Sequence, residues 1–147
     1  MDTLIKQQQE LSLKNACVNF MFAYQQRNVD KMLSYCEPEG EVFFKPLGDA
    51  GKGKIGELGR ALWTSLIDCF PDIDNTVDAT VAEDKDSVRC QVVIRGTQAK
   101  DFAGIVSKGK KFDSDHIFIF RLNDADKIDR IEITWDHEDF QRQLGAI

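Results

Sequence analysis

The stretch that decides the fold lies near the end of the chain and runs Ile128-Asp-Arg-Ile-Glu-Ile-Thr-Trp-Asp136-His-Glu-Asp-Phe-Gln-Arg-Gln-Leu-Gly145. Its first part alternates apolar and polar side chains, which is typical of a β-strand with one buried face. Trp135 falls on the apolar face, and Asp136 falls on the polar face. A short helix beginning at His137 is expected next, so Asp136 stands where the strand passes into the helix.

Asp136 has two interpretations, which depend on where the polar face of the strand looks. If this face looks into an apolar cavity, desolvation would raise the pKa of the carboxyl group and make it a candidate acid/base. If it looks at water, Asp136 is a surface residue that can cap the terminal helix, whose first turn also holds Glu138 and Asp139. The sequence leaves both interpretations open.

The same alternation extends back through the second half of the chain. One strand is marked by Val77, Ala79 and Val81, a second runs from Val88 to Gln98, and a third runs from about His116 to Leu122. A long connection over residues 101–111 separates the second strand from the third. Strands in this order, joined by turns, predict an antiparallel sheet.

The first half of the chain is helical. Apolar residues at helical spacing predict a long helix from about Leu4 to Arg27, a short one that ends at Cys36, and a third from about Lys54 to Cys69. A turn at residues 37–40, a short strand at residues 41–45 and a glycine-rich loop at residues 48–53 are expected between the second and third helices. Helices followed by strands predict one α+β domain over residues 1–147, with the helices packed on a curved, mostly antiparallel sheet.

Composition excludes several classes of function. The formal net charge of −6 argues against a nucleic-acid partner, because phosphate binding needs a concentrated basic patch. No apolar run approaches the ~18 residues that a membrane span needs. Four widely spaced cysteines and two histidines form no recognisable metal-binding motif, so buried thiols in a cytoplasmic protein are expected.

Several short segments, taken in order, resemble the SnoaL-like polyketide cyclases of the NTF2-like superfamily, which have a cone-shaped α+β (cystatin-like) fold. The segments are Leu62-Trp63 with Phe70-Pro71-Asp72, Val93-Ile-Arg95-Gly96-Thr97, Asp101-Phe102-Ala-Gly104-Ile105 with Gly109-Lys-Lys-Phe112, and Trp135-Asp136 with Asp139-Phe140-Gln-Arg-Gln-Leu144-Gly145. The resemblance covers nearly the whole chain, and it is more specific for the fold than for an activity.

The resemblance implies a chemistry. In such cyclases an aspartate at the Trp-Asp position of the last strand is the acid/base that closes a ring on a polyketide, without metal or organic cofactor. That role would fall on Asp136. The ligand would be a small apolar or aromatic carbonyl compound, and a homodimer is expected. The histidine that the cyclases carry on the preceding strand is matched here by Phe118, and His116 lies two residues earlier on the same face, so a changed substrate is expected.

Further side chains are candidates for the site. His116 could pair with Asp136 or be an ordinary core residue, and Arg95 could anchor a ligand or form a structural salt bridge. Tyr24, Phe44, Trp63, Phe118 and Trp135 would form the walls of any cavity. The leading hypothesis is therefore a cofactor-free small-molecule enzyme with Asp136 and His116 as catalytic residues. The alternative is a non-catalytic module that binds a ligand or forms dimers.

Overall fold

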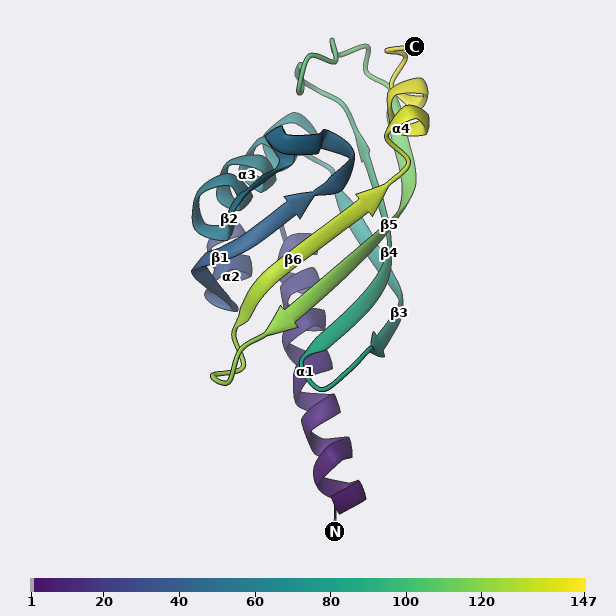
Figure 1. The fold of residues 1–147 in the computed structure, drawn as a ribbon. Coiled ribbons are helices and arrows are strands. Elements are labelled where there is room, and N and C mark those ends of the chain that lie inside the picture. Colours follow the sequence, from purple (N-terminus) through teal and green to yellow (C-terminus); the bar gives the residue numbers. More distant parts are fainter. Residues whose placement is uncertain (1) are drawn as a thin grey trace.

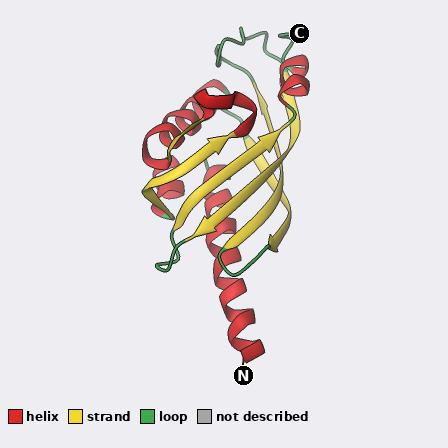
Figure 2. Ribbon diagram, viewed as in Figure 1, coloured by secondary structure: helices red, strands yellow, loops and turns green. Residues whose placement is uncertain are grey.

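A six-stranded sheet curves around the helices that cover one of its faces (Figures 1 and 2). The structure is a computed structural model that describes residues 2–147. The helical elements are α1 (Asp2–Gln25), α2 (Val29–Ser34), the 3-10 helix η1 (Lys45–Gly51), the π-helical turn η2 (Ile55–Gly59), α3 (Arg60–Cys69) and α4 (His137–Gln143). The strands are β1 (Cys36–Phe44), β2 (Lys52–Lys54), β3 (Asp74–Ala82), β4 (Ser87–Thr97), β5 (Lys111–Leu122) and β6 (Ile128–Trp135).

The strand order is β2-β1-β6-β5-β4-β3. All neighbours are antiparallel except β1 and β6, which run parallel. This arrangement places β6, the last strand of the chain, in the middle of the sheet beside β5. The predicted α+β class and the mostly antiparallel sheet are therefore confirmed. None of the described helices is long and apolar enough to cross a membrane.

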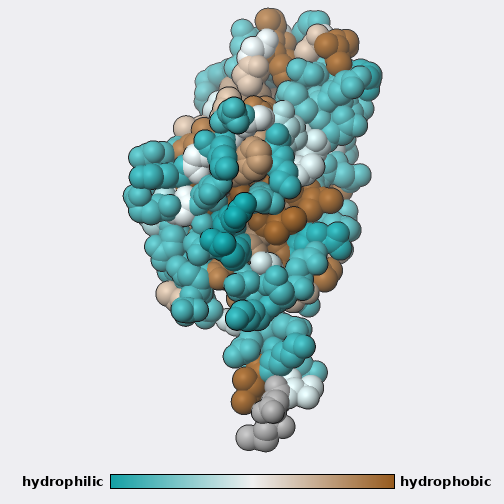
Figure 3. All heavy atoms as spheres, viewed as in Figure 1, coloured by the Kyte–Doolittle hydropathy of each residue, from teal (hydrophilic) through white to brown (hydrophobic). Residues whose placement is uncertain are grey.

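The alternation of apolar and polar residues predicted from the sequence separates a buried face of the sheet from an exposed one. On β5 every second residue from Phe112 to Leu122 is buried. The opposite face carries charged residues together with Ile117, which is 37% exposed. Figure 3 shows this outer face as largely hydrophilic, with a smaller hydrophobic patch.

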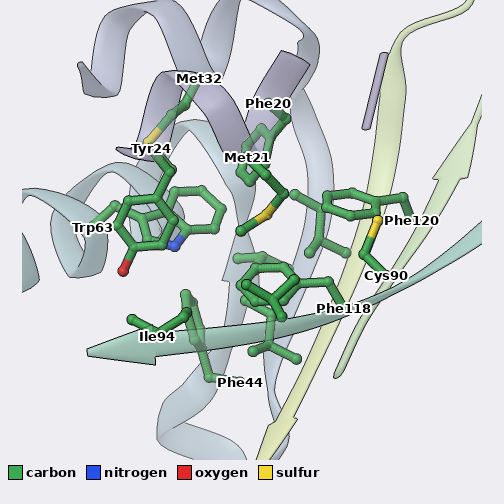
Figure 4. Packing of buried hydrophobic residues seen from close by; sticks show 14 of the residues in the cluster. Phe20, Met21, Tyr24, Met32, Phe44, Trp63, Cys90, Ile94, Phe118 and Phe120 are labelled. Atoms are coloured by element: carbon green, nitrogen blue, oxygen red, sulfur yellow. The ribbon is translucent and has the colours of Figure 1, made fainter. Parts of the chain in front are cut away.

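The core lies between the inner face of the sheet and α1 and α3. Phe20 packs edge-on against Trp63 and Phe120, with ring centroids 5.3 and 5.4 Å apart (Figure 4). All four cysteines are free and buried, as expected, and burial raises the pKa of the Cys36 thiol to about 12. These cysteines are therefore core residues.

Two predicted boundaries between α2 and α3 are wrong. The expected turn at residues 37–40 lies within β1, where Pro38 is tolerated because β2 pairs only from Glu41 onward and the pairing with β6 is irregular between Cys36 and Glu41. A Cβ atom at Gly40 would collide with the backbone carbonyl of Asp129, so this glycine permits the close approach of β1 to β6. The expected loop at residues 48–53 includes most of η1 and the start of β2.

Candidate functional site

An apolar cavity opens between α3, η1 and the corner where β6 meets α4. Its enclosed void is small, about 50 Å³, and the space between atoms reaches about 570 Å³ when the open mouth is included. The lining is almost wholly aromatic or aliphatic: Tyr24, Phe44, Leu47, Leu62, Trp63, Leu66, Ile73, Ile94, Phe102, Phe112, His116, Phe118, Ile133, Trp135, His137 and Phe140. Both histidines of the chain are in this lining. They are the titratable nitrogens at the cavity.

His116 lies on the inner face of β5, opposite Val92 of β4 and Trp135 of β6. It is 9% exposed, and its Nδ1 is 3.0 Å from the backbone oxygen of Ser114. A carbonyl oxygen only accepts hydrogen bonds, so in the neutral ring the proton is on Nδ1 and Nε2 is left as an acceptor. Burial lowers the pKa of His116 to about 4, against the opposing effects of the Ser114 contact and the Asp115 charge. At neutral pH this imidazole is thus an uncharged base.

His137 is the first residue of α4 and was not singled out by the sequence analysis. Its Nδ1 accepts a hydrogen bond from the Trp135 indole nitrogen at 3.2 Å, and its ring stacks on Phe140 with centroids 5.8 Å apart. Desolvation lowers the pKa of His137. The sequence does hold one signal for this residue, since His137 directly follows Trp135-Asp136 and is one of only two histidines in the chain.

Two further polar groups line the cavity. Tyr24 is 2% exposed and Trp63 is 1% exposed, and both side chains lie in the cavity lining. Figure 4 shows the Tyr24 hydroxyl pointing away from the helix that carries it. Burial raises the pKa of Tyr24, so its hydroxyl stays protonated and can donate. Phe44 and Phe118 add apolar wall, as expected from the sequence.

Asp136 does not enter the cavity. The residue is exposed, and its Oδ1 accepts a hydrogen bond from the backbone N–H of Asp139 at 3.0 Å, which makes it the N-cap of α4. The polar face of β6 looks at solvent, because the apolar face that carries Ile133 covers the core. The expected enclosure of Asp136 by apolar residues is therefore wrong, and the capping interpretation describes its contacts.

The structure also decides between the alternatives for His116 and Arg95. His116 pairs across the strands with Trp135 instead of Asp136, so the possible His116–Asp136 dyad does not form. Arg95 lies on the outer face of β4, where it binds Asp74 at 3.2 Å and Thr76 at 2.9 Å. The structural salt bridge, one of the two alternatives for Arg95, is therefore confirmed. The ligand-anchor alternative is wrong, because the period of the strand puts Arg95 opposite to the buried Ile94.

Comparison with known proteins identifies the family. A model of the SnoaL-like polyketide cyclase family matches residues 17–145. The chain belongs to the SnoaL-like polyketide cyclase family. A search of curated proteins finds no match.

Solved structures share the SnoaL-like fold. TsrD from Streptomyces laurentii is 25% identical, with a TM-score of 0.78 over 93% of this chain and 97% of that one. A putative SnoaL-like polyketide cyclase from Jannaschia sp. CCS1 is 16% identical, with a TM-score of 0.81 over 93% and 94% of the two chains. IdmH, a putative polyketide cyclase from Streptomyces antibioticus, is 22% identical, with a TM-score of 0.75 over 90% and 98%. The NTF2-like cone expected from the sequence is thereby confirmed.

The polar side chains that line the cavity of this SnoaL-like fold are uncharged at neutral pH: those of Tyr24, Trp63, His116 and His137. The described residues hold no group of three or more histidine, cysteine, aspartate or glutamate side chains that could bind a metal ion. The chemistry that the described cavity itself can provide is proton transfer to His116 and hydrogen bonding from Tyr24, Trp63 and His137.

Proposed function

We propose that this SnoaL-like protein binds a small aromatic or apolar carbonyl compound in its cavity and catalyses an acid–base ring closure of the cyclase type, with His116 as the base. The observation that carries the proposal is the His116 imidazole, which is buried at the wall of an apolar cavity, with Nδ1 bound to Ser114 and no hydrogen bond to Nε2 among the described residues. Such a nitrogen is available to take a proton from a bound ligand.

In the proposed reaction one proton moves from the substrate to His116 and later returns to the ring-closed product. Nε2 of His116 takes a proton from a carbon between two carbonyl groups, the C–H bond breaks, and its electron pair forms an enolate. The enolate carbon then attacks another carbonyl carbon of the same molecule, which forms the C–C bond of the ring. The resulting alkoxide takes the proton back from His116. The product is an isomer of the substrate, so this step needs no oxidant or reductant.

The low pKa of His116 restricts the substrate class. An imidazole that becomes protonated only near pH 4 is a weak base, so the carbon acid has to be activated, as a carbon between two carbonyls is. The imidazolium ion that forms would stack on Trp135, whose ring centroid is 5.5 Å away, and a cation over an aromatic face is stabilised. Positioning of the two reacting carbons in the cavity would supply much of the remaining acceleration.

Ligand entry requires the mouth of the cavity to widen. The enclosed void of about 50 Å³ has room for one or two water molecules, whereas ligand pockets usually measure about 300–1,000 Å³. Leu47, Leu62 and Leu66 line the mouth and are only half-buried, so these side chains are the ones that would move.

The proposal is tested by hydrogen–deuterium exchange at the acidic carbon of methyl benzoylacetate, an aryl β-keto ester, followed by proton NMR. The wild-type protein is expected to accelerate exchange over the buffer rate. Leu66→Phe, which fills the mouth, is expected to lower the acceleration at least about tenfold by blocking access. Ile117→Phe enlarges a side chain on the outer face of the sheet and should retain full activity.

Two results would contradict this function. A wild-type protein that gives only the buffer rate is not a base catalyst for this class of compound, and an unimpaired Leu66→Phe variant would place the reaction elsewhere. Thermal unfolding of both variants shows that any loss is not a loss of fold.

A non-catalytic binding module is the second candidate, and a cavity lining without aspartate, glutamate, lysine or arginine favours it. This module would bind the keto ester, with chemical-shift changes at Trp135 and His116, and leave the exchange rate unchanged. The homodimer implied by the family resemblance and the cytoplasmic location expected from the composition remain predictions.

A further inference from the structure

Trp135 contacts both histidines of the cavity. Its ring is stacked on His116, with centroids 5.5 Å apart and planes inclined by 21°, and it meets His137 edge-on at 5.9 Å and 77°. Its indole nitrogen is 3.2 Å from Nδ1 of His137. One side chain thus fixes the position of two imidazoles at the same cavity.

The hydrogen bonds give the two imidazoles opposite tautomers. An indole N–H only donates, so Nδ1 of His137 accepts, and the proton of the neutral ring is on Nε2. In His116 the contact with the Ser114 oxygen puts the proton on Nδ1. His116 therefore presents an acceptor at Nε2, and His137 presents a donor at Nε2.

The terminal helix holds His137 in a fixed relation to β5. Asp136 caps α4, and Phe140 stacks on the His137 ring. Farther along α4, the Gln143 amide accepts from the backbone N–H of Asp113 at 2.7 Å and donates to its carbonyl oxygen at 3.1 Å. Asp113 lies three residues before His116 on β5. The strand that carries His116, β5, and the helix that carries His137, α4, are thus hydrogen-bonded to each other.

We propose that His137 is a second catalytic residue, whose Nε2–H donates a hydrogen bond to the oxygen on which negative charge develops, and that Trp135 is a positioning residue that selects this tautomer. The proposal rests on the proposed function. It specifies the ligand as a compound in which a carbonyl oxygen and the acidic C–H lie on neighbouring atoms, as in a 1,3-dicarbonyl, so that His137 meets the oxygen and His116 meets the hydrogen.

The role of His137 requires no transfer of its own proton. The proton that leaves carbon goes to His116 and returns to the alkoxide, while His137 stays neutral and stabilises the oxyanion by its hydrogen bond. A neutral donor suits this position, because the enolate oxygen lies in an apolar cavity where a hydrogen bond is stronger than in water. Sequence reasoning centred on Asp136 misses this arrangement, because it depends on the direction of an indole N–H.

The tautomers are measured directly by nitrogen-15 NMR of the imidazole rings in the wild-type protein, with the four ring nitrogens assigned from the His116→Gln and His137→Gln variants. We expect protons on Nδ1 of His116 and on Nε2 of His137. In Trp135→Phe, which keeps an aromatic ring but removes the indole donor, His137 should become a mixture of tautomers while His116 stays unchanged. A proton on Nδ1 of His137 in the wild-type protein would overturn the inference.

Hydrogen–deuterium exchange at the acidic carbon of methyl benzoylacetate tests whether His137 takes part in catalysis. His137→Leu removes the donor and should lower kcat about 100-fold. His137→Gln keeps an N–H donor and should retain more of the activity than His137→Leu. An active wild-type protein together with an equally active His137→Leu variant overturns this inference and leaves the proposed function standing. A wild-type protein without activity overturns both, while the tautomer measurement still reports on the contact between Trp135 and His137.

Discussion

Truncation of Trp63 to alanine is expected to lower the free energy of unfolding by about 3–5 kcal/mol, the usual cost of removing a large aromatic side chain from a core. Trp63 is 1% exposed on α3, and its ring packs edge-on against Phe20 of α1 and Phe44 of β1, with centroids 5.3 and 5.7 Å apart. It therefore joins three separate elements. Loss of the ring removes apolar burial and leaves a void that these elements cannot close without moving.

Urea unfolding of the Trp63→Ala variant measures this loss. Ile117→Ala is the matched control, because Ile117 is 37% exposed on the outer face of the sheet, and its truncation should cost no more than about 1 kcal/mol. A Trp63→Ala variant as stable as this control would mean that α3 is not anchored to the sheet as described. Since Trp63 also lines the cavity, the same variant should have a larger cavity.

Acidification is expected to destabilise the protein through His116 by about 3 kcal/mol. Burial lowers the pKa of His116 in the folded protein from 6.5 to about 4, and each unit corresponds to about 1.4 kcal/mol. The unfolded chain takes up a proton near pH 6.5, whereas the folded protein does not until about pH 4. The stabilising contribution is thus fully present above pH 6.5 and is lost as the pH falls to about 4.

Unfolding free energies of the wild-type protein and of His116→Phe, measured between pH 7 and 4, isolate this contribution. The carboxyl groups of Asp72 and Glu132, whose pKa values are lowered in the fold, titrate in both proteins and cancel in the difference. We expect the wild-type protein to lose about 3 kcal/mol more than His116→Phe over this range. Equal losses would show that His116 is solvated in the folded protein.

Much of the fold can be predicted from the spacing of apolar residues along the chain. A strand or helix that packs one face on the core needs apolar residues at the spacing that brings them to that face. The alternation in β4, β5 and β6 correctly predicts their inner faces, as the buried residues from Phe112 to Leu122 illustrate. The predictions fail where local signals are ambiguous. Pro38 and Gly40 are typical turn residues, yet both lie in β1, because the irregular pairing of β1 with β6 accommodates them.

The candidate site is predictable to a lesser extent. Aromatic residues expected as walls, such as Tyr24 and Trp63, do line the cavity, because they lie on apolar faces. Periodicity also places Asp136 on the polar face of β6, which looks at solvent, and its expected role in the cavity came from the family resemblance. His137 lies beyond the strand, where no period applies, and its role depends on the Trp135 hydrogen bond.

The central claim is that the base in this cavity is His116 and that Asp136 serves as the cap of α4. The most direct test compares the His116→Gln and Asp136→Asn variants in the exchange of methyl benzoylacetate. Removing a general base typically costs 10²–10⁴-fold, so His116→Gln should lose at least about 100-fold of the acceleration. Asparagine caps a helix as well as aspartate, so Asp136→Asn should stay close to the wild-type rate. An inactive Asp136→Asn variant beside an active His116→Gln variant would contradict the account.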